Sequence, residues 1–290
     1  MRFLLLIITA LWVSTLCAQS QDMVTETTNQ NITGREIMEK FNKAKEVNYP
    51  YSPLVHSAIL TEKETLKGDR LYTSKALVEY MRAGYFDEEN DKIRLINGHN
   101  DVHIDSLFKS NMLGGLSQIK KDIIKYPIEI LDSKNSEYEF RAGQIVVDNE
   151  IQYKVELVPK NDKAKYEGFL YFDYESYALV KAEVSLTDFG IKLLNRIQSK
   201  NDFEWVDLKE TIIYTKPDWV KHYLADDDRY YLSSIVTKGH GIHLKLKEKS
   251  VVTNSLRIIS TNRTTFFANE YEDLDDNKAL SKLDFDTEEP

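Results

Sequence analysis

The stretch YEGFLYFDYESYALVKAEVSL, residues 166–186, decides the fold that we expect for this chain. Strand-like runs rich in apolar residues lie on both sides of a polar centre at residues 173–177. This is the pattern of two antiparallel strands joined by a short turn. Similar pairs of runs recur before and after it, so the sequence predicts a series of antiparallel hairpins.

The runs expected to form strands have a period of two and short polar connections. They cover residues 54–66, 70–82, 92–96, 138–147, 151–158, 166–172, 178–186, 203–215, 219–224, 230–237, 242–246 and 251–259. About ten sequential strands in one sheet curl, because strands twist. We therefore expect a meander that bends into a half-barrel.

Helical periodicity predicts the cover of this sheet. Residues 34–46 follow the capping residue Thr33 and place Ile37, Met38 and Phe41 on one face. Residues 106–126 have a similar apolar stripe and end at a proline, and a short helical stretch surrounds residues 191–197. The expected fold class is α+β: a large curved antiparallel β-sheet with the helices near 34–46 and 106–125 on its concave face.

The first 18 residues have the pattern of a signal peptide. Arg2 precedes an apolar run that is too short to span a bilayer, and Ala18 precedes a polar segment. Cys17 is the one cysteine of the chain and leaves an alternative open, attachment of a lipid. Leu16 disfavours that alternative, because lipoprotein signals have a small residue before the cysteine. We expect export, cleavage near Ala18 and no transmembrane segment.

Composition and charge divide the rest of the chain. Residues 19–33 are polar and predict a flexible lead-in, and residues 34–267 predict one curved-sheet domain. Residues 268–290 hold nine acidic residues and two lysines, which accounts for −7 of the formal net charge of −9. This pattern predicts an acidic, disordered tail. The nearly neutral remainder has no basic face of the kind that binds nucleic acid.

Metal chemistry has one candidate constellation, His99, Asp101, His103 and Asp105. Alternate residues of a strand point the same way, so these imidazoles and carboxylates could converge on zinc or a similar ion. The competing interpretation is a polar loop in which Asp105 caps a helix. Four ligands on one strand also have poor geometry, since residues two apart are about 6.5 Å apart. We therefore expect no metal, no cofactor and no catalytic residue.

Aromatic residues are concentrated in the expected strands, and ordinary cross-strand packing explains most of them. A curled sheet lined by aromatic groups could also form a concavity for an apolar ligand. The candidate cavity residues are Phe169, Tyr171, Trp219 and Tyr231.

Several segments resemble one family in the same order along the chain. Residues 173–186 resemble the hairpin D-x-E-S-x-A-(I/L)-(V/I)-(R/K)-A-E-x-S-L of exported Gram-negative envelope proteins that are labelled carboxypeptidase-regulatory-like-domain proteins. Residues 112–117, 166–173 and 229–235 resemble three further segments of that family. The usual N-terminal β-sandwich has no counterpart here. The resemblance therefore covers the C-terminal module, which is similar to the curved-sheet fold of lipoprotein-localisation carriers, and it implies no catalytic residues.

The function expected from these features is non-enzymatic. We expect a periplasmic or outer-membrane-associated protein of the cell envelope that binds a lipid or a lipoprotein acyl chain in a curved-sheet cavity. One alternative is a structural or protein-interaction module that meets an envelope partner. Another is a metal-dependent hydrolase built on the His99 constellation. The first function predicts an apolar cavity, and the second predicts an exposed apolar patch. The third predicts metal ligands that converge.

Overall fold

The computed structural model describes residues 32–67, 69–86, 91–102, 118–198, 203–216, 228–244, 247–262 and 272–273. The expected signal peptide and residues 217–227, which include Trp219, lie outside the described residues. The same holds for His103, Asp105 and most of the acidic segment.

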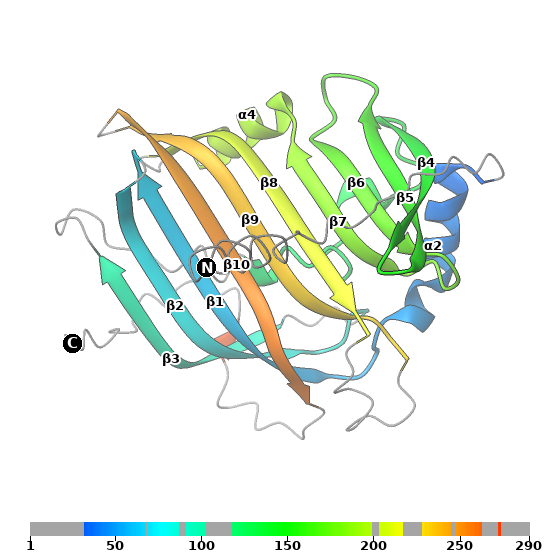
Figure 1. Cartoon of the computed structure of the whole chain (residues 1–290), viewed down its shortest axis with the longest axis horizontal. Helices are drawn as coiled ribbons and strands as arrows, with labels where there is room; N and C mark the ends of the chain where they lie inside the picture. Colours follow the sequence, from blue (N-terminus) through cyan, green and yellow to red (C-terminus); the bar gives the residue numbers. More distant parts are fainter. Residues whose placement is uncertain are drawn as a thin grey trace, which may run out of the picture.

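The described strands form one antiparallel sheet in the order β11-β3-β2-β1-β10-β9-β8-β7-β6-β5-β4 (Figure 1). They are β1 (Leu54–Leu66), β2 (Asp69–Arg82), β3 (Lys92–Val102), β4 (Tyr138–Val147), β5 (Glu150–Pro159), β6 (Tyr166–Asp173), β7 (Leu179–Leu186), β8 (Phe203–Thr215), β9 (Tyr231–His243), β10 (Glu248–Asn262) and β11 (Glu272–Asp273). The sheet is not one continuous meander, because β1 pairs with β10 along its whole length. That pairing brings residues nearly two hundred positions apart onto one surface.

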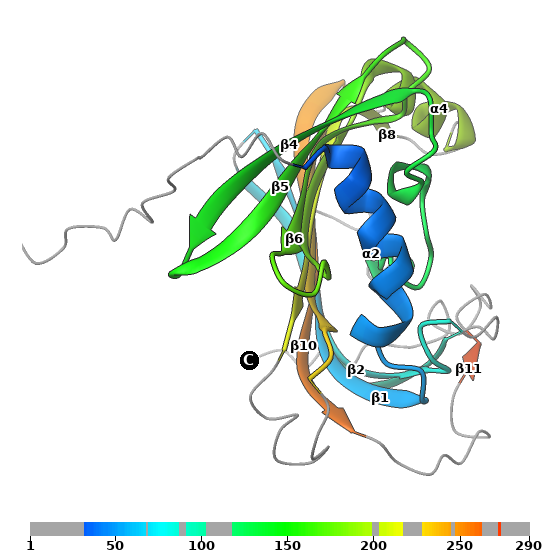
Figure 2. The same cartoon turned by 90° about the vertical axis from the view of Figure 1, so that its right-hand side faces the viewer.

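Two α-helices of the described residues lie on the same side of the sheet, which bends around them (Figure 2). These are α2 (Gly34–Asn48) and α4 (Asp188–Ile197), and η1 (Glu129–Leu131) is a short 3-10 helix. The expected fold class, a large curved antiparallel sheet with helices on its concave face, is confirmed.

Helix α2 begins where the sequence predicts. The Thr33 side chain accepts a hydrogen bond from the backbone of Glu36, and the Glu36 side chain accepts one in return from the Thr33 backbone. This reciprocal pair satisfies helix-terminal N–H groups that would otherwise lack partners. Ile37, Met38 and Phe41 are completely buried, and the Phe41 ring lies 5.4 Å from that of Phe172.

The prediction of a helix over residues 106–126 fails in its described part. Gln118 and Ile119 are helical, and the chain then turns through Tyr126. Asp122 explains the break, because its side chain accepts a hydrogen bond from the backbone of Ile124, 3.1 Å away, and competes with the helical ladder. The expected apolar stripe still faces inward, since Ile119, Ile123 and Ile124 are buried.

A buried ion cluster fixes this turning segment against the sheet. Arg82, completely buried on β2, pairs with Asp122 and, at 3.3 Å, with Asp91. Asp122 also accepts a hydrogen bond from the Tyr214 hydroxyl on β8, at 2.7 Å. The segment around residue 122 is therefore tied to two strands on opposite sides of the β1–β10 pair.

Two predicted strand boundaries are wrong. Strand β3 continues past Asn97 and Gly98 to Val102, because Gly98 pairs directly with Ala76. Residues 231–237 and 242–243 belong to the single strand β9, which ends at His243 rather than restarting at residue 242. Within the acidic segment, Glu272–Asp273 pair with Lys92 and Ile93 of β3.

Candidate functional site

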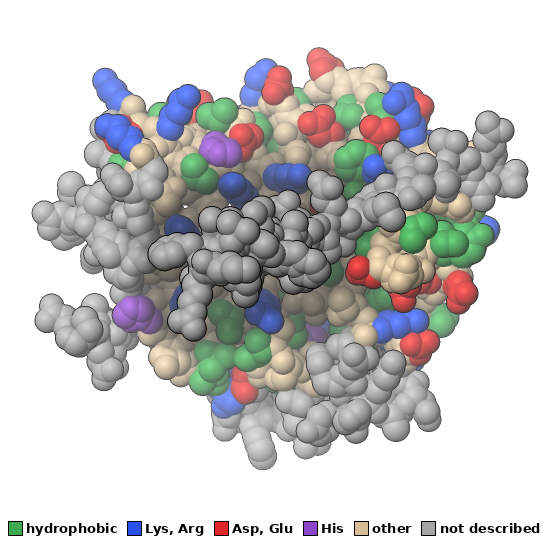
Figure 3. Space-filling view, viewed as in Figure 1, with side chains coloured by type: hydrophobic (Ala, Val, Ile, Leu, Met, Phe, Trp, Pro, Cys, Tyr) green, Lys and Arg blue, Asp and Glu red, His purple; other side chains and the backbone are tan. Residues whose placement is uncertain are grey.

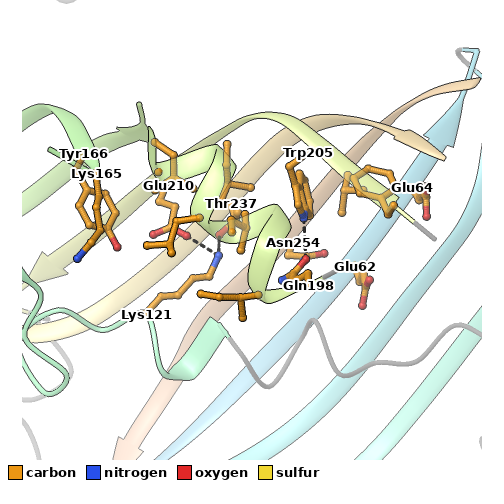
Figure 4. Close-up of a pocket in the computed structure, with 18 of the residues that line it drawn as sticks. Glu62, Glu64, Lys121, Lys165, Tyr166, Gln198, Trp205, Glu210, Thr237 and Asn254 are labelled. Carbon is orange, nitrogen blue, oxygen red and sulfur yellow. Dashed lines mark hydrogen bonds and ion pairs between the residues drawn. The ribbon is translucent and has the colours of Figure 1, made fainter. Parts of the chain in front are cut away.

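A cavity of about 580 Å³ lies between α4 and the concave surface of strands β1, β2, β8, β9 and β10 (Figure 4). Its volume falls within the range of about 300–1,000 Å³ that is usual for ligand pockets. The apolar wall consists of Leu193, Leu194 and Ile197 of α4 with Phe203, Trp205 and Leu208 of β8.

Two glycines of β9 make room for this wall. A Cβ on Gly239 would lie 2.6 Å from the Trp205 ring, and one on Gly241 would lie 2.1 Å from the Phe203 ring. Both rings therefore lie against bare backbone of the neighbouring strand. The sequence pattern around His240 favours a turn or bulge at these glycines. The structure instead has an irregularity on the partner strand, between Trp205 and Asp207 of β8.

Helix α4 is anchored at both of its ends. Thr187 caps the helix by accepting a hydrogen bond from Gly190 N, and its hydroxyl donates to the Ala164 carbonyl at 2.6 Å. At the other end, the Asn195 side chain makes two hydrogen bonds of 2.8 Å to the backbone of Trp205. Gln198 accepts the indole N–H of Trp205 at 3.0 Å. The roof of the cavity is thus attached to its aromatic wall.

The floor of the cavity is polar. Strand register places Glu62, Asn254, Thr237 and Glu210 in one row across β1, β10, β9 and β8. Residues paired across neighbouring strands have their side chains on the same face. The row therefore forms a polar belt opposite the apolar helix, with Glu64 beside it on β1.

Lys121 neutralises one end of this belt. Its ammonium pairs with Glu210 at 2.5 Å and donates to the Thr237 hydroxyl at 2.7 Å. The Thr237 hydroxyl in turn donates to Gln118 at 3.0 Å. Figure 4 shows Lys121 reaching Glu210 and Thr237, with Glu62 and Glu64 at the other end of the cavity.

The two carboxylates of β1 have hydroxyl partners instead. The Tyr72 hydroxyl donates to Glu62 Oε1 at 2.5 Å, and the Ser250 hydroxyl donates to Glu64 Oε1 at 2.5 Å. Burial raises the pKa of Glu62 to about 7; the charge of Glu64 adds to that rise, and the Tyr72 hydrogen bond opposes it. Glu62 Oε2 and Asn254 Oδ1, both buried, have no hydrogen-bond partner among the described residues.

The three predicted cavity residues that the structure describes, Phe169, Tyr171 and Tyr231, do not line this cavity. Phe169 and Tyr171 lie on the face of β6 opposite to Leu170 and Phe172, which are completely buried in the core under α2. Lys154 covers the Phe169 ring, and the Tyr171 hydroxyl donates to Glu183 at 2.8 Å. The face of the sheet opposite to α2 and α4 carries many charged side chains among apolar ones (Figure 3).

The other two candidates have different positions. Tyr231 is buried at the start of β9, opposite Thr215, and Trp219 lies outside the described residues. The cavity does have aromatic lining residues, but they are Tyr72, Tyr166, Phe203 and Trp205 and not the described candidates. Glu62 and Glu64 are a better indication of the cavity in the sequence. They continue the inward-facing series of Ala58 and Leu60 on β1, but their side chains are charged instead of apolar.

The metal constellation is described in part. His99 is exposed on β3, Asp101 lies two residues further along the same strand, and His103 and Asp105 lie outside the described residues. Within the part of the chain that the structure describes, no three His, Cys, Asp or Glu residues lie close enough to hold a metal ion. His240 and His243 point to opposite faces of β9: His240 pairs with Asp207 at the surface, and His243 lines the cavity.

Comparisons with known proteins give distant structural likeness. No family model and no curated protein matches the sequence. A LolA superfamily protein from Nitrosomonas europaea is 14% identical with a TM-score of 0.32, covering 83% of this chain and 98% of that one. A DUF1329 family protein from Desulfovibrio piger is 12% identical with a TM-score of 0.30, covering 78% and 92%.

A third structure is the S-type phycobiliprotein lyase of Guillardia theta, which is 8% identical with a TM-score of 0.21, covering 81% of this chain and 96% of that one. With TM-scores below 0.5, these likenesses assign this chain neither a family nor a ligand. Among the described residues, no helix combines the length and the apolar content that crossing a membrane requires.

Proposed function

We propose that this protein is a non-enzymatic, exported protein of the cell envelope that holds the hydrocarbon part of a lipid or a lipoprotein acyl chain in the cavity under α4. The resemblance of residues 166–186 to exported envelope proteins supports the location, and it favours the carboxypeptidase-regulatory-like family. The leader-like residues 1–18 support export.

One observation carries the proposal. Helix α4 turns Leu193, Leu194 and Ile197 towards a space that the sheet does not fill, and Ile197 remains 73% exposed. Apolar surface left against a cavity is stabilised when a hydrocarbon removes it from water, by about 0.8 kcal/mol for each buried methylene. Binding of this kind needs no catalytic group.

The test of this proposal blocks the cavity with a large side chain on one of the strands that line it. Val252 of β10 lines the cavity, whereas Val236 of β9 is exposed and is not among the lining residues. Val252→Trp and Val236→Trp are therefore the same chemical change inside and outside the site. Diphenylhexatriene, a fluorescent hydrocarbon without hydrogen-bonding groups, reports occupancy by its increase in emission.

We expect wild type and Val236→Trp to bind the probe equally, and Val252→Trp to bind it at least about tenfold more weakly, because the indole occupies the site. Absence of binding by the folded wild-type protein would refute carriage in this cavity. Equal binding by Val252→Trp would place the ligand elsewhere.

A further inference from the structure

The floor of the cavity contains two neighbouring acceptors that the protein does not satisfy. Glu62 is 7% exposed, and its Oε2 atom has no hydrogen-bond partner among the described residues. Asn254 Oδ1 is also buried without a hydrogen-bond partner among the described residues. Asn254 on β10 is the residue paired with Glu62 on β1. Both residues line the cavity. Buried acceptors without donors destabilise a fold, so a donor is expected at this point.

The nearby cations of the described residues are engaged elsewhere. Lys121 pairs with Glu210, and Lys165 pairs with Glu129. Glu62 and Glu64, by contrast, are bonded to the neutral hydroxyls of Tyr72 and Ser250. The end of the cavity floor formed by β1 therefore holds two carboxyl groups that no described ion pair neutralises.

One donor within the protein could serve these atoms. A protonated Glu62 can donate its own O–H to Asn254 Oδ1, and burial raises the pKa of Glu62 to about 7. This arrangement satisfies both atoms only while the carboxyl group is neutral. A ligand that brings both a positive charge and N–H groups replaces the proton and serves both acceptors.

We propose that the ligand is an amphiphile with a protonated primary amine, whose N–H groups bond to Glu62 Oε2 and Asn254 Oδ1 while its hydrocarbon lies under α4. This inference rests on the proposed function and adds the chemistry of the head group. Figure 4 shows Glu62 and Asn254 at the same end of the cavity as Trp205 and Gln198. Leu193, Leu194 and Trp205 line the apolar part of the same cavity.

The experiment compares three ligands with the same hydrocarbon chain. Dodecylamine, dodecanol and dodecanoate, each below its aggregation concentration, displace diphenylhexatriene at pH 7.5. We expect dodecylamine to bind roughly 10- to 100-fold more tightly than dodecanol, as for a charge-assisted hydrogen bond in place of a neutral one, and dodecanoate to bind most weakly. Equal displacement by the amine and the alcohol would overturn the inference and leave the proposed function intact. Failure of diphenylhexatriene itself to bind would refute both the inference and the proposed function.

Matched variants locate the contact. Glu62→Gln is expected to abolish the preference for the amine while keeping the affinity for diphenylhexatriene within about twofold. Glu64→Gln removes the same charge, but Glu64 already has a donor in Ser250. It should therefore keep most of the preference. A preference that survives Glu62→Gln, or that both variants lose equally, would overturn the assignment.

A second variant covers the case in which Glu62→Gln does not fold. Asn254→Leu leaves the charge of the floor unchanged and removes the second acceptor. Loss of the amine preference in this variant supports the proposal. A full preference would refute the role of Asn254 and, with it, the two-acceptor site.

Discussion

The concave face of the sheet has two halves that differ in packing. Under α2 the helix and sheet interlock, since Ile37, Met38 and Phe41 are completely buried and Phe41 meets Phe172. Under α4 the corresponding leucines, Leu193 and Leu194, stay partly exposed above a cavity. One half is a hydrophobic core, and the other is a cavity built from the same two kinds of element.

The inward-facing residues of the strands explain the difference. Beneath α2, positions such as Leu170 and Phe172 are apolar and fill the space below the helix. Beneath α4, the row of Glu62, Asn254, Thr237 and Glu210 is polar. An apolar helix cannot pack directly on buried carboxylates without leaving them unsolvated, so the layers stay apart. Strand β1 shows both situations: its inward-facing residues are apolar at Ala58 and Leu60 and charged at Glu62 and Glu64, which line the cavity.

The largest expected effect is the loss of packing under α2. Phe41→Ala removes a completely buried ring and its contact with Phe172. We expect the free energy of unfolding to fall by about 3–5 kcal/mol, measured by urea denaturation. Probe binding under α4 should be unchanged at temperatures where the variant is folded. A loss below about 1 kcal/mol would show that this half is also loosely packed.

Alternation and capping in the sequence predicted the local parts of the fold well. The strand pairs on either side of residues 67–69 and 173–177 form as expected, and α2 begins at Gly34 after the predicted cap. Those features are local, because turn residues and side-chain periodicity lie within a few positions of each other. The pairing of β1 with β10 is not local, and no short-range pattern indicates it.

The half of the concave face under α4 depends on that long-range pairing. The residues that line its cavity were therefore not predicted from the sequence. Glu62 and Asn254 become neighbours only when β1 and β10 meet. Phe169 and Tyr171 were chosen for their aromatic character, but the alternation of β6 directs them away from the helices. Lys121 reaches Glu210 from a segment whose turns are set by the contacts of Asp122 with Arg82 and Tyr214.

An intermediate effect should come from the buried carboxyl group of Glu62. Burial raises its pKa from 4.5 to about 7. In the absence of ligand, the unfolded chain therefore loses this proton at lower pH than the folded one, and stability falls as pH rises from 4.5 to 7. Glu62→Gln removes this contribution, so its stability relative to wild type should rise by about 3 kcal/mol between pH 4 and pH 8. Urea denaturation across that range measures the difference, and a pH-independent difference would contradict the burial of the charge.

Glu183→Gln provides a control of opposite sign on the face opposite to α2 and α4. Although partial burial opposes the shift, hydrogen bonds from Lys181 and Tyr171 hold the pKa of Glu183 below its usual value. The charged form thus contributes stability above the unfolded pKa, and this contribution is lost as pH falls through the folded pKa. Glu183→Gln should be less stable than wild type at pH 7 and should approach it in acid. The two variants together distinguish a carboxylate that faces the cavity from one on the opposite face of the sheet.

The smallest expected effect on stability is at the roof of the cavity. Leu194→Ala removes an apolar side chain that is only partly buried and that faces open space, so little packing is lost and no new cavity is created. We expect the free energy of unfolding to fall by less than about 1 kcal/mol in urea denaturation. Affinity for diphenylhexatriene should nevertheless fall by roughly fivefold, because the ligand loses part of its apolar wall. A destabilisation as large as that of Phe41→Ala would mean that α4 supports the core as α2 does. An unchanged affinity would mean that the half of the face under α4 is hollow without being a site.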